Sequence, residues 1–331
     1  MDPDLTIIAE AATCHGGQLK EAIALVEAAA SSGADVIKFQ LIDPDKLYAP
    51  WTPDSSSYVP NPVIASRKSE LLTPDEWRIV HQAANDSGIQ FAFTVFDIEG
   101  LDFALAFDPP FIKIASGDIT HRQLLRAVGS CGKKTLLSTG MATLDEVKVA
   151  VENLFREGDP QVELLHCVSV YPCPPEIANL SRIHALKNLG FPVGFSDHTQ
   201  GSWASVAAVA MGARTLEKHF RRSTGPITID WQHSLDEAQF FDYVRDVRLT
   251  KTGVDPQSDL GVSERETRSR ARRSPYAGRD LPEGHVLSWD DLVMLRPMHT
   301  QDEDQPEYFV GKALVTAVKE GDPVNHSHVS N

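Results

Sequence analysis

Three lysines lie inside stretches that read as buried β-strands, where a charged side chain is unusual. They are Lys38 in DVIKFQL, Lys113 in FIKIAS and Lys218 in TLEKHF. A buried ammonium group needs a charge partner, because burial removes its hydration. Three such lysines together predict a site for an anion. The alternative is that each lysine pairs with a nearby carboxylate, for which the candidates are Glu10, Asp118 and Glu217.

Two histidines, His198 and His219, fall at the ends of the last two strand-like stretches. If these strands are neighbours, the two imidazoles are close enough to share one divalent ion. Two nitrogen ligands completed by oxygen or water suit Mn²⁺, Zn²⁺ or Mg²⁺, and favour Mn²⁺ or Mg²⁺ when substrates supply the oxygens. A structural hydrogen-bonding role for both histidines is equally consistent with their positions.

The elements that must position these side chains alternate regularly over residues 1–245. Eight strand-like stretches are each followed by a helical one. Two of the helices open with a capping box, Thr73 to Glu76 and Thr143 to Glu146. Eight βα units of about 30 residues favour a closed (β/α)8 barrel, with an open α/β sheet as the alternative. The strands are expected at residues 5–11, 35–41, 90–96, 111–116, 134–140, 162–169, 191–198 and 215–220.

A (β/α)8 barrel places its active site at the carboxyl ends of the strands. Most polar residues of interest fall there: besides the lysines and histidines, they are Glu10, Gln40, Thr94, Ser116, Asp118 and Ser138. The sequence contains no P-loop, no GxGxxG after a strand and no GxSxG elbow. It therefore offers no support for nucleotide binding of these kinds or for Ser-His-Asp catalysis.

Composition narrows the class of protein. The 331 residues are 42% hydrophobic and carry a formal net charge of −15, which argues against a nucleic-acid partner. No apolar run is long enough to span a membrane, and the N-terminus lacks the features of a secretory signal. The four cysteines show no CxxC spacing, which favours reduced thiols. We expect a cytoplasmic protein with no membrane or nucleic-acid partner.

The βα alternation stops after residue 245. Residues 246–270 are polar and charged, which is typical of an exposed linker with some helix. Residues 271–331 contain short strand-like pieces between the turn signals PEG and EGDP. They predict a small, mostly β second domain, which at this size would pack on the barrel or on a second subunit.

Several strings in the barrel region resemble the sialic acid synthase family, which includes the legionaminate, pseudaminate and spore-coat polysaccharide synthases. Among them are KIASGD, STGMATLDE, LLHCVSVYP, GFSDHTQG and GARTLEKHF, in the order and spacing of the family. The segment SPYAGRDLPEGHVLSWDDLVMLRP resembles the family's antifreeze-like (SAF) domain. The resemblance covers almost the whole chain. It implies a (β/α)8 barrel followed by a small SAF domain.

The resemblance also implies a reaction, a C–C bond-forming transfer. Phosphoenolpyruvate condenses with an open-chain N-acyl sugar aldehyde, such as N-acetylmannosamine, to give a sialic-type nonulosonic acid and phosphate. A divalent ion, most readily Mn²⁺ with Mg²⁺ or another ion possible, polarises the aldehyde oxygen. The SAF domain closes over the partner subunit's barrel, so a domain-swapped homodimer is implied. Its Arg296 matches an arginine that touches the acyl group of the sugar.

The remaining roles are carried over position by position from the same motifs. His198 and His219 match the metal ligands. Glu10, Asp118 and Asp230 match carboxylates that face the metal, its water or the sugar, and with Lys113 they form the expected catalytic set. The other substrate-binding positions are Lys38, Gln40, Thr94, Ser116, Ser138, Tyr171, Asn179 and Arg296.

The chain departs from the family pattern mainly on the acceptor side. A glycine-proline-aspartate-histidine segment is replaced by GPITIDWQHS, and Cys14-His15-Gly16-Gly17 follows the first strand in place of the family's asparagine-histidine-asparagine-glycine. The acceptor sugar can therefore differ from that of other members. The alternative function is a related 3-deoxy-ulosonic acid phosphate synthase that uses a different aldose. The expected SAF domain argues against it, because Arg296 would have no acyl group to contact.

Overall fold

The computed structural model describes residues 5–54, 57–255, 261–299 and 305–330. The chain divides into two compact units, Met1–Val254 and Asp255–Asn331. Within the described residues, no helix combines the length and apolar character needed to cross a membrane.

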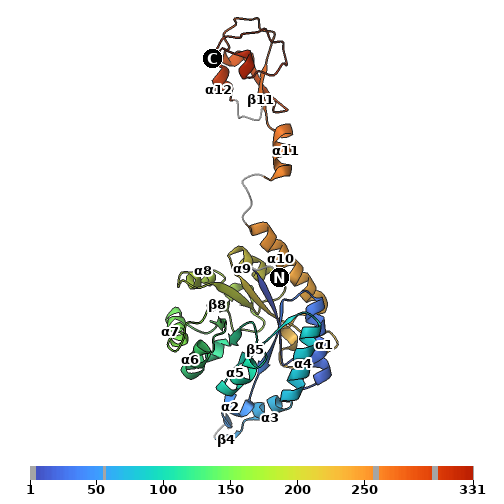
Figure 1. The fold of residues 1–331 in the computed structure, drawn as a ribbon, viewed down its shortest axis with the longest axis vertical. Coiled ribbons are helices and arrows are strands. Elements are labelled where there is room, and N and C mark those ends of the chain that lie inside the picture. The colour runs from blue at the N-terminus through green and yellow to red at the C-terminus, as the bar shows by residue number, and fades with distance from the viewer. Residues whose placement is uncertain (1–4, 55–56, 256–260, 300–304, 331) are drawn as a thin grey trace. The chain divides into compact units, whose positions relative to one another are not determined.

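The first unit is a closed barrel of parallel strands (Figure 1). The strands follow one another around it in the order β1, β10, β9, β8, β7, β6, β5, β2. Each predicted strand is present, and closure of the sheet confirms the barrel over the open alternative. The bounds are β1 Thr6–Ala12, β2 Val36–Leu41, β5 Gln90–Val95, β6 Ile112–Ile114, β7 Thr135–Ser138, β8 Val162–Cys167, β9 Val193–Asp197 and β10 Thr215–His219.

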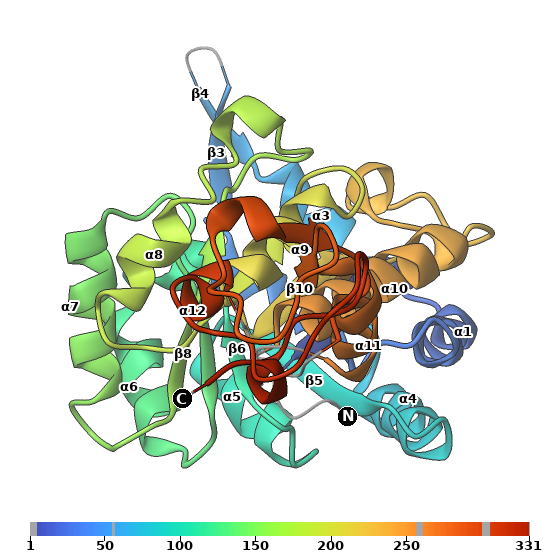
Figure 2. The same ribbon diagram turned by 90° about the horizontal axis from the view of Figure 1, so that it is seen from above.

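Helices lie outside the strands (Figure 2). Both predicted capping boxes are formed: Thr73 opens α4 and Thr143 opens α7, each with its glutamate three residues on. These caps satisfy backbone N–H groups that a helix leaves unpaired, and so fix where each helix leaves its loop. The bounds are α1 Leu19–Ser31, α4 Pro74–Asp86, α5 Ile98–Leu105, α6 Arg122–Ser130, α7 Leu144–Leu154, α8 Arg182–Lys187, α9 Trp203–Ala210 and α10 Glu237–Val254.

The interior of the barrel is layered. An apolar floor is built by one cluster of buried side chains, Ile8, Val36, Ala92, Phe111, Leu136 and Leu165. Side chains two residues apart on a strand share a face, so the next inward layer comes two positions later on each strand. That layer is mostly polar: Glu10, Lys38, Thr94, Lys113, Ser138 and Cys167. The barrel therefore holds its charged groups directly above a dry floor, at the carboxyl ends of the strands.

An insertion between β2 and α4 widens one side of this face. It contains α2 Pro44–Leu47, the antiparallel pair β3 Trp51–Asp54 and β4 Ser57–Pro60, and α3 Pro62–Lys68. Asp43 and Asn61 cap the two short helices by accepting hydrogen bonds from Asp45 N–H and Val63 N–H. These local caps give the insertion a defined course at the rim.

The second unit is small and has a core of its own. Helix α11 Val262–Ala271 precedes β11 Ser274–Ala277, which pairs antiparallel with β12 Leu292–Leu295, and α12 Pro306–Phe309 follows. Of the expected linker 246–270, α10 and α11 occupy most of the part that is described, whereas residues 256–260 lie outside the described ranges. The core is formed by Ala277, Leu281, Leu287, Phe309, Leu314, Val318, Val324 and Val329.

Candidate active site

A cavity of about 310 Å³ opens at the carboxyl ends of the strands, directly above the polar layer. Ten residues proposed from the sequence line it together, although they come from eight different strands and their loops. They are Glu10, Lys38, Gln40, Thr94, Lys113, Ser116, Ser138, Tyr171, His198 and His219. We call this cavity the barrel mouth.

Lys38 and Lys113 face two carboxylates across the barrel mouth. The ammonium group of Lys38 forms an ion pair with Glu10, lies 3.5 Å from Glu217 Oε2 and donates to Thr94 Oγ1 at 2.6 Å. Lys113 Nζ is 3.8 Å from Glu217 Oε1 and donates to the carbonyl of Ile114. Pairing with carboxylates, the alternative left open by the sequence, therefore accounts for Lys38, whereas the ion pair of Lys113 with Glu217 is longer.

The two carboxylates differ in protonation. Burial raises the pKa of Glu10, and the nearby Lys38 does not offset it. Burial would also raise the pKa of Glu217, but Lys113 and Lys38 outweigh it and lower that pKa to about 2. Glu217 is thus ionised at neutral pH, and Glu10 takes up a proton more readily. Protonation of Glu10 would release Lys38 from its ion pair, whereas burial lowers the pKa of Lys113.

Hydroxyl groups complete the lysine-lined side of the barrel mouth. The buried Ser138 Oγ has no hydrogen-bond partner, although such groups are normally satisfied. Ser116 Oγ accepts a bond from Gly140 N–H at 3.0 Å. A Cβ on Gly140 would come within 2.4 Å of Ser169 Oγ and 2.8 Å of Ser116 Oγ, so only glycine leaves these hydroxyls in place. The arrangement supplies polar donors beside Lys113 for an anion.

Lys218 does not join this group. It lies on β10 between Glu217 and His219, and alternate residues of a strand point to opposite faces. Its Nζ is 3.0 Å from Asp197 Oδ2 and also bonds the carbonyl of Thr199, behind the barrel wall. For Lys218 the carboxylate-pairing alternative is therefore the one realised.

His198 and His219 lie side by side, with ring centroids 5.6 Å apart. His198 Nδ1 lies 2.8 Å from the carbonyl of Val168, which makes Nδ1 the protonated nitrogen and leaves Nε2 with its lone pair. His219 Nδ1 is buried without a partner. Burial is the main cause that lowers the pKa of His219 to about 3, so the ring is neutral at physiological pH. A divalent ion requires neutral imidazoles with free nitrogens, which His219 provides. Burial lowers the pKa of His198, but contacts with Cys167 and the Val168 carbonyl outweigh it and raise that pKa, so an ion would have to displace a proton from a protonated His198.

Two further residues approach His219 from the loop between β10 and α10. Asp230 precedes the short 3₁₀ helix η3 Trp231–His233, and His233 is its last residue. Each offers a ligand atom that lies within 4.8 Å of the other's and of a ligand atom of His219. Asp230 was proposed from the sequence and His233 was not. The only available signal was their three-residue spacing, which can put two side chains on one side of a turn.

The other proposed residues lie outside the lining of the barrel mouth. Asp118 ends the 3₁₀ helix η1 Ser116–Asp118 after β6, and burial raises its pKa to about 6. Asn179 is exposed, with φ of 44°, and accepts a bond from Ser181 Oγ. Arg296 is exposed in the second unit, just after β12. Their functional roles stay predictions.

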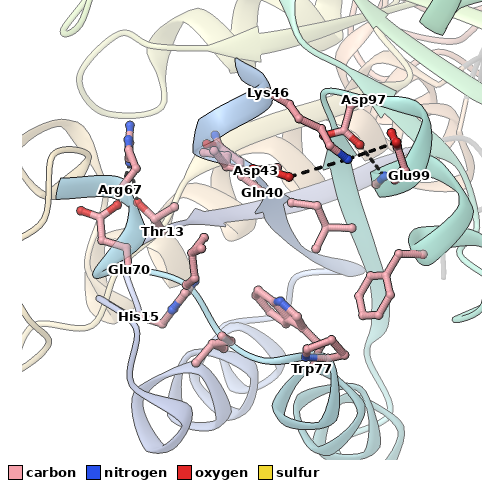
Figure 3. Close-up of a pocket in the computed structure, with 17 residues that line it drawn as sticks. Thr13, His15, Gln40, Asp43, Lys46, Arg67, Glu70, Trp77, Asp97 and Glu99 are labelled. Atoms are coloured by element: carbon pink, nitrogen blue, oxygen red, sulfur yellow. Dashed lines mark hydrogen bonds and ion pairs between the residues drawn. The ribbon is translucent and has the colours of Figure 1, made fainter. Parts of the chain in front are cut away.

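A second, larger cavity of about 410 Å³ lies beside the barrel mouth, under the β2–α4 insertion (Figure 3). Gln40 lines both cavities and donates to Glu10 Oε1 at 3.0 Å. Lys46, between Asp43 and Glu99, lies at one side of the second cavity, and Arg67 bonds Thr13 and Glu70 at the other. Its apolar lining includes Leu41, Leu71, Leu72, Pro74, Trp77 and Phe103.

His15, at the wall of the second cavity, is expected to make the stability of the fold depend on pH. Its ring packs on Phe39 and Trp77, and burial lowers its pKa from 6.5 to about 4, weakly opposed by Glu76. The pKa of His15 is lower in the folded protein than in the unfolded chain. The neutral ring therefore contributes its full stabilisation of the fold above pH 6.5, and this contribution is lost as the pH falls toward 4.

We therefore expect His15→Gln to flatten the pH dependence of unfolding. Between pH 7 and pH 5 the wild type should lose about 2 kcal/mol of unfolding free energy that the variant keeps. Urea unfolding at the two pH values measures this loss. His184→Gln, at an exposed position on α8, is the control and should behave as wild type. Equal losses in wild type and His15→Gln would show that His15 is not the titrating group.

Comparison with known proteins agrees with this geometry. The NeuB family matches residues 25–256, and the SAF domain matches residues 272–330. N,N'-diacetyllegionaminic acid synthase of Campylobacter jejuni is 34% identical over 328 residues, which cover 95% of this chain and 97% of that protein. Human N-acetylneuraminate-9-phosphate synthase is 30% identical over 334 residues, covering 98% and 92%.

Solved structures give the same result. N-acetylneuraminic acid synthetase from Leptospira borgpetersenii, in complex with citrate, matches with a TM-score of 0.70 and 31% identity, covering 80% of this chain and 90% of that one. A truncated 3-deoxy-D-arabino-heptulosonate 7-phosphate synthase from Thermotoga maritima shares the fold, with a TM-score of 0.58 at 17% identity. The family match spans well over half of the chain, so this protein belongs to the NeuB family and carries a SAF domain.

Proposed function

We propose that this protein is an enzyme that condenses phosphoenolpyruvate with an open-chain N-acyl sugar aldehyde. The products are a nonulosonic acid and phosphate, and the reaction is a C–C bond-forming transfer. The observation that carries the proposal is the barrel mouth, where a side lined by lysines and hydroxyl groups faces the adjacent imidazoles of His198 and His219. The NeuB relatives named as sialic and legionaminic acid synthases support the product class.

Lys113 and Ser138 are the groups best placed to hold phosphoenolpyruvate. Phosphoenolpyruvate carries a phosphate and a carboxylate. Both anionic groups need hydrogen-bond donors that are not already fully engaged in ion pairs or hydrogen bonds within the protein. Lys113 has one long ion pair and Ser138 Oγ has no partner. Ser116 and Lys38 line the same cavity. Fixed donors in a site shielded from water stabilise the departing phosphate more than water does, because they need no reorganisation.

His198 and His219 are the residues we propose for a divalent ion, most readily Mn²⁺, with Mg²⁺ or another divalent ion possible. Their fit rests on His198 Nε2, left free by the bond at Nδ1, and on the unpartnered Nδ1 of the neutral His219. When bound, such an ion polarises the aldehyde oxygen of the acceptor.

Carboxylates of the site handle the protons. The methylene carbon of phosphoenolpyruvate forms a bond to the aldehyde carbon, water adds at the neighbouring carbon that bears the phosphate, and phosphate leaves. The aldehyde oxygen takes up a proton and the added water gives one up. Glu10, with its raised pKa, is suited to hold a proton at Oε1 or Oε2, and Asp118 titrates near pH 6. Asp230, beside His219, is a third candidate.

The acceptor is expected on the side of Tyr171. The ring of Tyr171 packs against the ring of His198, with centroids 4.0 Å apart. Asn179 and Arg296 remain proposed substrate contacts, the latter from the SAF domain of a partner subunit in a domain-swapped homodimer. An assay with Mn²⁺, phosphoenolpyruvate and a panel of N-acyl hexosamines tests the proposal. Phosphate release that depends on N-acetylmannosamine or a related amino sugar supports it. Release only with a pentose or hexose phosphate would favour an ulosonic acid phosphate synthase.

Arg296→Ala is expected to weaken the acceptor selectively. Loss of one charged contact to a substrate should raise the acceptor KM about tenfold or more, while the KM of phosphoenolpyruvate changes little. Steady-state kinetics with each substrate varied in turn measures the difference. Arg279→Ala is a control in the same unit, because Arg279 pairs with Asp291. An equal change in both KM values would give the SAF domain a structural role only.

A further inference from the structure

His219 has a second imidazole neighbour besides His198. The ring of His233 meets the ring of His219 edge-on, with centroids 4.9 Å apart and planes at 88°. This is closer than the 5.6 Å between His219 and His198. The ring of Tyr171 lies beside all three imidazoles, at 4.0 Å from His198, 5.0 Å from His233 and 5.9 Å from His219.

Asp230 adds a carboxylate to this group. Its Oδ1 lies 3.2 Å from His233 Nε2, and ligand atoms of His219, Asp230 and His233 all lie within 4.8 Å of one another. The side chains of His233 and Asp230 are only 11% and 16% exposed, so water reaches them poorly.

An ion pair between Asp230 and His233 alone leaves one observation unexplained. His219 Nδ1 is buried and has no hydrogen-bond partner, and an unpaired buried nitrogen is costly. His198 does not relieve it, because no hydrogen bond joins the two rings. A ligand that draws on His219, Asp230 and His233 together would account for their convergence.

We propose that His219, Asp230 and His233 form a divalent metal site with His198 at its edge, so that His233 is a third imidazole of the metal centre. This inference rests on the proposed metal-assisted function and extends it. Two imidazoles and a carboxylate favour first-row transition ions such as Mn²⁺, Fe²⁺, Co²⁺ or Zn²⁺ over Mg²⁺, which prefers oxygen ligands. His233 lies in GPITIDWQHS, the segment in which this chain departs from the glycine-proline-aspartate-histidine pattern.

Metal titration of the chelator-treated full chain tests the inference without turnover. We expect His233→Ala to weaken Mn²⁺ binding about 10- to 100-fold by calorimetry, the range seen even for residues behind a ligand. Co²⁺ affinity should fall by more than Mg²⁺ affinity, and the visible absorption of bound Co²⁺ should change. Added imidazole should restore part of the Co²⁺ affinity of His233→Ala. His184→Ala, with an exposed histidine on α8, should bind as wild type.

His233→Gln separates a ligand from a positioning role, because glutamine can keep the bond to Asp230 but is a poor ligand for these ions. Weak Mn²⁺ binding by both His233→Ala and His233→Gln supports His233 as a metal ligand. Wild-type affinity in both, with binding lost in His219→Ala, would overturn the role of His233 and leave the proposed function standing. Absence of Mn²⁺ and Co²⁺ binding by the wild type would overturn the metal site and the metal-assisted function together.

Discussion

Replacing His219 by alanine is expected to lower kcat by at least about a thousandfold and to remove the bound divalent ion. On the proposed function, an ion held here would contribute several kcal/mol to stabilising the charge that develops on the acceptor oxygen, and each 1.4 kcal/mol or so is a factor of ten in rate. His219 is central to the group, since His198, Asp230 and His233 all lie around it. His198→Ala should act in the same direction.

His166 provides a matched control for this experiment. It is a buried histidine on strand β8, but it points behind the barrel wall, where Nε2 pairs with the carbonyl of Ala178. His166→Ala should lower thermal stability and still bind the ion. The metal content of the dialysed variants measures ion binding, and phosphate release from phosphoenolpyruvate measures kcat. Near-normal rates for His198→Ala and His219→Ala in the presence of a chelator would rule out the metal assignment.

Strand positions and the inward layer could be read from the sequence because they repeat. The eight strands recur at regular spacing, and most of them place an apolar residue two positions before a polar one, as Ile8 before Glu10 and Val36 before Lys38. The two-residue period of a strand, applied to eight strands that must close, brings these polar residues to one mouth. Convergence of ten proposed residues on one cavity follows from this repetition.

The same two-residue period places Lys218 on the opposite face of its strand from Glu217 and His219. A lysine within a buried strand indicates an anion site only if its side chain faces the barrel mouth. His219 and Glu217 face the barrel mouth, so the residue between them has to face the helices. There Asp197 neutralises it. The alternation of faces that excludes Lys218 from the barrel mouth is already present in the sequence.

The loop residues carry no such period. His233 and Asp230 lie in an irregular segment after β10, whose course depends on contacts with distant parts of the chain. The bond from Thr228 Oγ1 to Cys14 Sγ is one of these contacts, joining residues 214 positions apart. The second cavity, under the insertion of residues 42–72, depends on packing of the same kind. Local caps locate such helices in the sequence, but they do not reveal which side chains meet.

The other large effect expected is from Lys113→Met. This change removes one of the two ammonium groups of the barrel mouth and leaves Glu217 paired with Lys38 and Ser196. Truncating a buried charged contact to a ligand costs about 2–5 kcal/mol, which corresponds to roughly a thirtyfold to several-thousandfold fall in kcat/KM for phosphoenolpyruvate. The stability of the barrel should change less, because Lys113 lies 3.8 Å from its carboxylate partner.

Lys218→Met is the matched variant, since both lysines are buried on barrel strands and differ in the face they occupy. Removal of Lys218 leaves Asp197 in the wall without its 3.0 Å ammonium partner, and breaking such a pair costs about 3–5 kcal/mol of stability. Urea unfolding and kinetics with phosphoenolpyruvate varied should therefore rank the two variants in opposite orders. If Lys218→Met affected phosphoenolpyruvate as strongly as Lys113→Met, charge anywhere in the barrel, rather than in its mouth, would govern binding of the anion.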